Sequence, residues 1–134
     1  MNRAVAPEAL LELAADAATR AYVPYSSFRV GAVAVDDDGN THCGANIENA
    51  AYPATICAEA NAITTAVAAG ARRIATVAVV CLDGDLCTPC GNCRQIMREF
   101  GVETVILSTP EGEPLAMTLN ELLPMSFGPE ALDA

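Results

Sequence analysis

The sequence predicts an α/β protein, a three-layer α/β/α sandwich around a mixed five-stranded sheet. Segments with a helical apolar period alternate with short β-branched segments, in the order helix, strand, strand, helix, strand, helix, strand. The turn DDDGN at residues 36–40 joins the first two strands as a hairpin. The continuous apolar run at residues 74–81 suits a central strand that is buried on both faces. We expect the chain of 134 residues to form a single domain, residues 1–134.

The first half of the chain supplies two helices and the hairpin. Residues 7–21 place small apolar side chains on one face of a helix and acidic side chains on another. Residues 28–35 are rich in valine and predict a strand, and residues 41–46 predict the return strand. A non-periodic loop at residues 47–56 precedes a helix at residues 57–69.

The second half begins with the central strand and a loop at residues 82–88. Pro89 then suits the start of a helix. The later elements are a helix, a strand, a short edge strand and a helical turn, at residues 89–100, 104–108, 115–119 and 120–123. The tail after about residue 128 is expected to be loosely ordered.

The charge and composition limit the partners. The formal net charge is −10, and all seven basic residues are arginine. Such a surface repels a polymer of phosphates, so nucleic acid is not expected as a partner. No segment is long and apolar enough to span a membrane, and the N-terminus MNRAVAPEAL lacks the apolar core of a signal peptide. We therefore expect a soluble, cytoplasmic protein whose thiols stay reduced.

Three of the six cysteines have the spacing of metal ligands. Cys57 stands in the sequence CAE, and Cys90 and Cys93 stand in PCGNC. A helix N-terminus favours the thiolate form that binds zinc, and both sequences begin a predicted helix. Three thiolates leave one zinc coordination position open for water. Cys87 as a fourth ligand would close the site and make it structural.

Glu59 lies two residues after Cys57 on a helical stripe that is otherwise apolar. Burial of a carboxylate is costly and raises its pKa, which suits a general acid and base beside metal-bound water. Its alternative role is an exposed carboxylate at a helix N-terminus. His42 is the single histidine and is expected at the surface, so no histidine is left to activate a Ser or Cys nucleophile.

Four motifs in order make the chain resemble a cytidine deaminase of the small three-cysteine type. AYVPYSSFRVGA at residues 21–32 resembles the first strand of that family and the loop before it, and NIENAAY at residues 46–52 resembles its ribose-binding segment. PCGNCRQ at residues 89–95 matches its second metal motif, and residues 122–127 resemble its C-terminal signature. The Cys-x-Glu and Pro-Cys-x-x-Cys pattern is the known signature of zinc deaminases.

This resemblance implies hydrolytic deamination of cytidine and 2′-deoxycytidine in pyrimidine salvage, with one Zn²⁺ per subunit. Cys57, Cys90 and Cys93 would bind the zinc. Glu59 would take a proton from water at the zinc, deliver it to pyrimidine N3 and then help ammonia leave.

The resemblance also implies the substrate contacts. Asn46 and Glu48 would hold the ribose hydroxyls, Phe28 would stack near the base, and the backbone of Ala58 would contact the ring. Without the resemblance, core packing would be the preferred role of Phe28.

Assembly follows from the same resemblance. Family members are commonly homotetramers that share residues between sites, so Tyr52 and Phe127 would reach a neighbouring subunit. Core packing is again the alternative role for Phe127.

One position departs from the family pattern. Small members often carry arginine directly after the catalytic glutamate, where this chain has Ala60. Neutralisation of the thiolates would then fall to Arg94, to nearby N–H groups and to the helix dipoles. We therefore expect the zinc-bound water to be less acidic than in arginine-bearing relatives.

Three other functions are weighed against this one. A deaminase for a modified cytidine or an aminonucleoside antibiotic is disfavoured by the intact NIEN segment. A nucleic-acid editing deaminase needs a basic groove, which the acidic charge opposes. A structural zinc module needs a closed site with four ligands.

Overall fold

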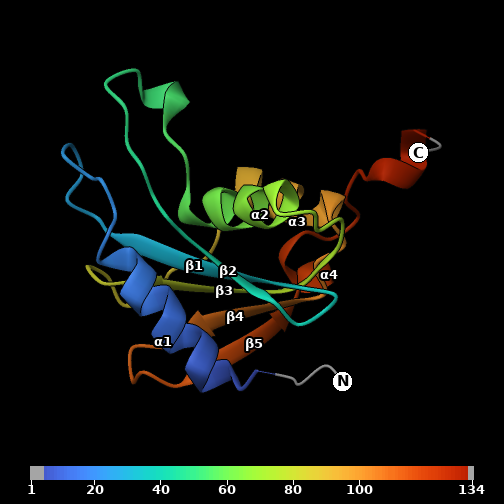
Figure 1. The fold of residues 1–134 in the computed structure, drawn as a ribbon, viewed down its shortest axis with the longest axis horizontal. Coiled ribbons are helices and arrows are strands. Elements are labelled where there is room, and N and C mark those ends of the chain that lie inside the picture. Colours follow the sequence, from blue (N-terminus) through green and yellow to red (C-terminus); the bar gives the residue numbers. More distant parts are fainter. Residues whose placement is uncertain (1–4, 133–134) are drawn as a thin grey trace.

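Helices cover both faces of a mixed five-stranded sheet in the computed structural model, which describes residues 5–132 (Figure 1). The strands lie in the order β2-β1-β3-β4-β5 and are β1 (Val30–Asp36), β2 (Thr41–Ala45), β3 (Ile74–Cys81), β4 (Thr104–Ser108) and β5 (Pro114–Thr118). Only β3 and β4 pair in parallel; the other three neighbouring pairs are antiparallel. The predicted three-layer sandwich and mixed sheet are therefore confirmed.

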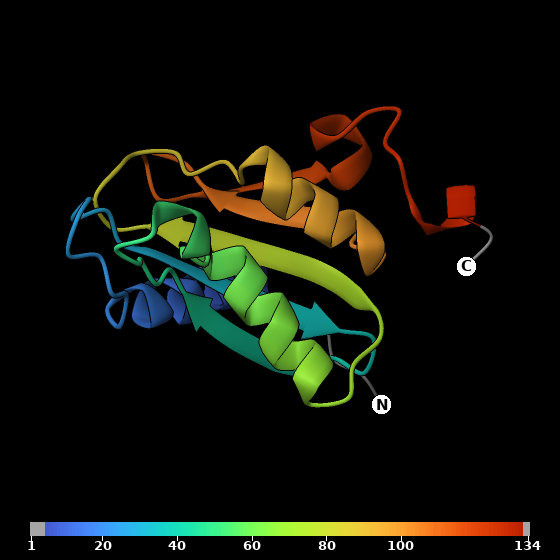
Figure 2. The same ribbon diagram turned by 90° about the horizontal axis from the view of Figure 1, so that it is seen from above.

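The helices divide into two layers. Helix α1 (Pro7–Ala18) covers one face, and helices α2 (Ala58–Ala68) and α3 (Gly91–Glu99) lie side by side over the other (Figures 1 and 2). A short helix, α4 (Leu119–Leu122), follows β5. Each layer has its own apolar core, and the larger core lies between the sheet and the pair α2 and α3. This larger core supports the start of both helices.

Two glycines let the helices approach the sheet closely. A Cβ atom added to Gly31 of β1 would overlap the backbone of Ala14 and Ala18 in α1. A Cβ atom added to Gly44 of β2 would overlap Ala62 N and lie 2.8 Å from Ala58 O in α2. Small residues on both sides of each contact therefore set the depth at which the helices sit.

Some predicted boundaries shift by a few residues, because tertiary contacts end the elements. The predicted helix 7–21 stops at Ala18, and residues 19–21 form turns that lead into a bridge between Tyr22 and Ile47. The predicted helix 89–100 begins at Gly91 because Cys90 has extended backbone angles as the N-cap. The bounds of β3 and β4 are the predicted ones.

One local expectation, the surface position of His42, fails, and the C-terminal tail contains a short helix. His42 is half-buried rather than at the surface, because its Nε2 atom lies 2.9 Å from the Oδ2 atom of the buried Asp36. The tail expected to be loosely ordered forms a 3-10 helix over Pro129–Leu132, and residues 133–134 lie outside the described range. The ion pair between Arg98 and Glu130 ties this helix to α3. Among the helices formed by residues 5–132, none has the length and apolar composition needed to cross a membrane.

Candidate functional site

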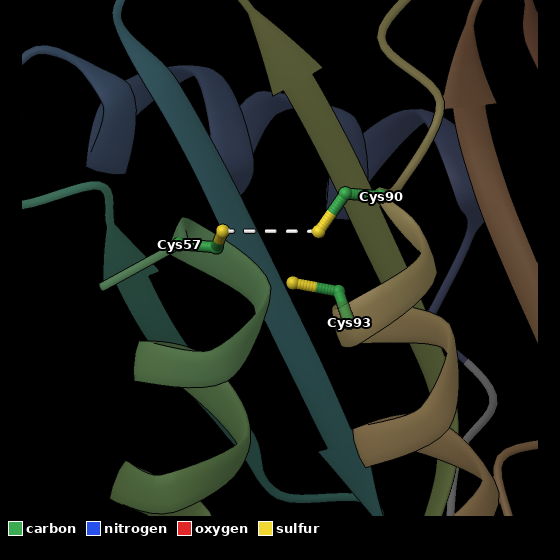
Figure 3. Close-up of side chains that lie close together, drawn as sticks. All are labelled: Cys57, Cys90 and Cys93. Carbon is green, nitrogen blue, oxygen red and sulfur yellow. Dashed lines mark hydrogen bonds between the residues drawn. The ribbon is translucent and has the colours of Figure 1, made fainter. Parts of the chain in front are cut away.

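Three cysteine thiols meet where the N-termini of α2 and α3 lie side by side (Figure 3). The Sγ atoms of Cys57, Cys90 and Cys93 all lie within 4.8 Å of one another, and those of Cys57 and Cys90 are 4.0 Å apart. Zn–S bonds of about 2.3 Å at a tetrahedral angle place sulfur atoms roughly 3.8 Å apart. The donor set and its spacing therefore fit a zinc ion, as the spacing of the cysteines predicted.

The helix starts explain why the thiols converge. Cys57 and Cys90 are the N-cap residues of α2 and α3, and neither side chain makes a capping hydrogen bond to its own helix. Cys93 is the third residue of α3, and its side chain is fully buried. The unpaired N–H groups and positive dipole ends of both helices thus face the three sulfur atoms. This environment favours thiolates, the form that a metal requires.

Hydrogen bonding between the thiols shifts the pKa values of Cys57 and Cys93 in opposite directions. A hydrogen bond from Cys93 lowers the pKa of the Cys57 thiol to about 6, although burial opposes the shift. The same hydrogen bond, together with burial, raises the pKa of Cys93. The thiolate form is therefore favoured at Cys57, and a zinc ion would displace the remaining protons.

Glu59 is buried beside this cluster. Only 5% of the residue is exposed, and it shares the buried face of α2 with Ala62 and Ile63. Burial raises the pKa of Glu59 to about 7, and the negative charge of Cys57 adds to the shift. A carboxyl group with this pKa exchanges protons readily at neutral pH. The predicted burial of Glu59 is confirmed.

Cys87 is not part of the cluster. Among the described residues, the ligand atoms that come within 4.8 Å of one another are those of Cys57, Cys90 and Cys93. The pKa of the Cys87 thiol is raised mainly by burial, and a hydrogen bond between Cys87 and Cys81 raises it further. A closed site with Cys87 as the fourth ligand is therefore not formed.

Similarity to known proteins adds to this geometry. The family model described as the cytidine and deoxycytidylate deaminase zinc-binding region matches residues 5–109. This chain belongs to that family. A cytidine deaminase from Sporosarcina psychrophila is 42% identical over 127 residues, which covers 93% of each chain. One from Mycobacterium tuberculosis is 40% identical over 115 residues, with 86% of this chain and 84% of the relative covered.

Solved structures of deaminase family members share the fold. The crystal structure of cytidine deaminase from Burkholderia pseudomallei has a TM-score of 0.85 at 41% identity and covers 92% of this chain and 100% of its own. The structure from Mycobacterium tuberculosis has a TM-score of 0.81 at 39% identity, with coverage of 93% and 99%. The zinc requirement of the family agrees with the three-thiol cluster.

The deaminase segment expected to bind ribose is held by backbone contacts. Asn46 accepts a hydrogen bond from Val30 N at 2.9 Å and donates one to Phe28 O at 2.8 Å. Glu48 accepts hydrogen bonds from Tyr25 N at 2.9 Å and Ser26 N at 3.1 Å. Hydrogen bonds from Ser26 and Tyr25 lower the pKa of Glu48, so it is ionised at neutral pH. Both side chains are thus oriented before any ligand binds.

The three aromatic candidates are exposed, so neither Phe28 nor Phe127 belongs to the apolar core. Phe28 is 39% exposed, Tyr52 is 70% exposed and Phe127 is 62% exposed. Tyr52 makes an edge-on contact with Tyr25, with ring centroids 5.8 Å apart, and lines a cavity of about 290 Å³ together with Glu48. Phe127 O accepts a hydrogen bond from Gln95 in α3.

Two residues bear on the charge of the thiol cluster. Arg94 donates hydrogen bonds to Pro89 O at 2.7 Å and Leu122 O at 2.6 Å, so its guanidinium is tied to backbone carbonyls. Ala60 is half-buried in the first turn of α2 and carries no charge. The N-termini of α2 and α3 also supply positive potential to the sulfur atoms, through their N–H groups and helix dipoles.

Sequence reasoning missed one charged pair near Phe28. Arg29 and Asp83 are 54 residues apart, yet their side chains form two hydrogen bonds. Residues 82–88 appeared only as a loop in the sequence, and nothing local marks Asp83 as a partner of Arg29. Only the antiparallel pairing of β1 with β3 brings the two together.

Proposed function

We propose that this chain catalyses the hydrolytic deamination of cytidine and 2′-deoxycytidine to uridine and 2′-deoxyuridine plus ammonia. The observation that carries the proposal is the buried Glu59 next to three convergent thiols that leave one metal position open. Relatives about 40% identical over most of the chain are cytidine deaminases, which supports the same reaction.

The chemistry divides between the metal and the protein. Cys57, Cys90 and Cys93 would hold a zinc ion, which would act as a Lewis acid toward the attacking water. Glu59 would take a proton from that water and deliver it to pyrimidine N3 as the water oxygen bonds to C4. It would then pass the hydroxyl proton to the amino group, so that the C4–N bond breaks and ammonia leaves, because its pKa of about 7 suits both roles. Its low exposure keeps bulk water away from the transferred proton. The backbone of Ala58, at the start of α2, is proposed to contact the pyrimidine ring.

Substrate binding is assigned to the segments beside the zinc ligands. Asn46 and Glu48 are proposed to hold the ribose hydroxyls, since each retains acceptor capacity beyond its backbone partners. Phe28 is proposed to stack near the base, and its exposed ring suits that contact. A polar pair for the sugar favours an ordinary nucleoside over the free base.

We propose a homotetramer in which Tyr52 and Phe127 complete neighbouring sites. Exposed apolar side chains support assembly where they are contiguous, as at Ile47, which bridges both Tyr22 and Ile56, because contiguous apolar patches mark interaction surfaces. The exposed side chains include Tyr22, Tyr25, Ile47, Tyr52, Ile56, Met125 and Phe127. We further propose that residues 1–134 act as one cytoplasmic domain in nucleoside salvage, with Arg94 contributing to charge neutralisation near the site. Light scattering should give four times the chain mass of 13.9 kDa, and a monomeric mass for active enzyme would refute the tetramer.

Replacement of Glu59 by Gln tests the catalytic proposal. The substitution keeps the shape of the side chain and removes the titrating carboxyl, so kcat should fall by about a hundredfold to ten-thousandfold. Zinc content, measured by metal analysis, should stay at one per chain. Glu8, an acidic residue in the first turn of α1, offers the matched control, and Glu8→Gln should leave kcat unchanged. Loss of zinc in Glu59→Gln would indicate a structural metal site, and full activity would refute the role of Glu59.

A further inference from the structure

We propose that Arg29 and Asp83 form a clamp that positions Phe28 for contact with the substrate base. The clamp is a positioning device that touches neither the zinc ligands nor Glu59. This inference rests on the proposed function, and in particular on the proposed stacking role of Phe28.

Both the backbone N–H and the guanidinium of Arg29 donate hydrogen bonds to the carboxylate of Asp83. Its Oδ2 atom accepts hydrogen bonds from Arg29 N at 2.7 Å and from Arg29 Nε at 3.0 Å, and its Oδ1 atom accepts one from Arg29 Nη2 at 2.9 Å. These hydrogen bonds lower the pKa of Asp83 to about 2, so the pair stays charged at neutral pH. Because two guanidinium N–H groups bind the two carboxylate oxygens, the pair fixes the orientation of the Arg29 and Asp83 side chains as well as their separation.

The backbone completes the hold on residue 29. Leu82 N donates a hydrogen bond to Arg29 O at 3.0 Å, directly after the last pairing of β1 with β3. Residue 29 is thus bound through its N–H, its carbonyl and its side chain, all by residues 82 and 83. Since Phe28 precedes it, the clamp fixes where the Phe28 backbone leaves the sheet.

Gly84 lies against the aromatic ring of Phe28. A Cβ atom added to Gly84 would lie 3.0 Å from Cε1 and 3.2 Å from Cζ of Phe28, so the ring rests against the residue 84 backbone. On the other side, Phe28 N donates to Ser26 Oγ and Phe28 O accepts from Asn46. Because hydrogen bonds hold the Phe28 backbone on both sides, the contact with residue 84 sets the orientation of the Phe28 ring. Because Gly84 follows Asp83 directly, the clamp brings this contact surface to the ring.

The first test removes the carboxylate. For Asp83→Ala we expect KM for cytidine to rise by about five- to tenfold with kcat within about twofold, because base stacking acts mainly through binding. Asp83→Asn keeps one acceptor oxygen and should recover part of the loss. Asp16 forms an exposed ion pair with Arg20 in the first helical layer, so Asp16→Ala is the matched control and should leave KM unchanged.

The second test asks whether the effect passes through Phe28. Asp83→Ala and Gly84→Ala are each measured alone and combined with Phe28→Ala, with zinc content and Tm recorded for each protein. Both should raise KM in the parent and have less than about a twofold effect once Phe28 is absent, since residues that act as a unit are non-additive. Equal effects in both backgrounds, or an unchanged KM for both, would overturn the clamp.

The design separates this inference from the proposed function. If Phe28→Ala raises KM but the Asp83 and Gly84 variants do not, the clamp fails and the role of Phe28 stands. If Phe28→Ala leaves KM unchanged, the stacking role and the clamp fail together, while deamination by the parent still supports the reaction. Should Asp83→Ala lose its fold, Asp83→Asn and Gly84→Ala carry the same comparison.

Discussion

The Sγ atom of Cys57 lies 4.0 Å from the Sγ atom of Cys90, and the two residues are the N-caps of α2 and α3. The N-termini of two helices, from segments 33 residues apart in the sequence, thus converge on the same thiol cluster. Their separation depends on how α2 and α3 pack on the sheet. The metal site is therefore expected to respond both to changes in its ligands and to changes in helix packing.

Loss of one thiol should release the metal. For Cys90→Ala we expect zinc content to fall well below one per chain, and activity to fall with it, because two thiolates bind zinc weakly. Chelation of the parent should lower Tm, since a ligand at a thousand times its Kd stabilises a fold by about 4 kcal/mol. Cys43 lies in β2 outside the cluster, so Cys43→Ala should retain zinc. Equal zinc loss in both variants would contradict the assigned ligands.

The contact between β2 and α2 should be intolerant of added volume. Gly44→Ala would force a Cβ atom into the backbone of Ala62 and Ala58, and we expect a loss of about 1–3 kcal/mol in the free energy of unfolding. Zinc affinity should fall as well, because Ala58 follows Cys57. Urea unfolding measures the first effect and metal titration the second.

Gly91 provides the control for that experiment. It has open space around its Cα position and stands at the start of α3, so Gly91→Ala should be neutral or stabilising by up to about 1 kcal/mol. If Gly44→Ala were as stable as Gly91→Ala, the close packing of α2 on β2 would be contradicted.

The buried pair of Asp36 and His42 should make stability sensitive to acid. Burial raises the pKa of Asp36, but hydrogen bonds from His42 and from the backbone of Asn40 and Asp38 outweigh it, and the net pKa is lowered. A lowered folded-state pKa means that the ionised carboxylate stabilises the fold above the ordinary pKa of 3.8, and that this contribution is lost as pH falls through the folded-state value.

Urea unfolding at a series of pH values measures this contribution. The stability advantage of the parent over Asp36→Asn should be constant near neutral pH and shrink below about pH 4. Asp16→Asn, in an exposed pair, should show a much smaller difference at every pH. An advantage of the parent that grows on acidification would contradict the assigned sign.

The uncharged Ala60, where small family members often carry arginine, should affect the pH–rate profile. For Ala60→Arg we expect the acidic limb of kcat to move to lower pH, because a guanidinium at residue 60 offsets the negative charge of the sulfur cluster. Thr64→Arg, one turn further along α2 and exposed, tests whether any added charge has the same effect and should leave the limb in place. Identical profiles for the parent and Ala60→Arg would refute the expected shift.

Much of the site could be predicted because its signals are local. Cys90 and Cys93 are three residues apart at a predicted helix start, and Glu59 stands out as a charge on an apolar stripe, so both signals come from spacing over a few residues. His42 was placed wrongly because its partner is the buried Asp36 across a turn, and composition does not reveal which turn carboxylate is buried. The helix start shifted to Gly91 because Cys90 is the N-cap of α3 and has the extended backbone angles usual at that position.

By itself, the sequence predicted the order of the elements, the bounds of β3 and β4, three candidate metal ligands and the buried carboxylate. These follow from residue spacing and apolar period, which act over a few residues. The tertiary structure alone decided that Cys57 meets Cys90, that Cys87 stays outside the cluster and that Asp83 binds Arg29. Such contacts depend on strand pairing and helix packing between distant segments, so no local pattern encodes them.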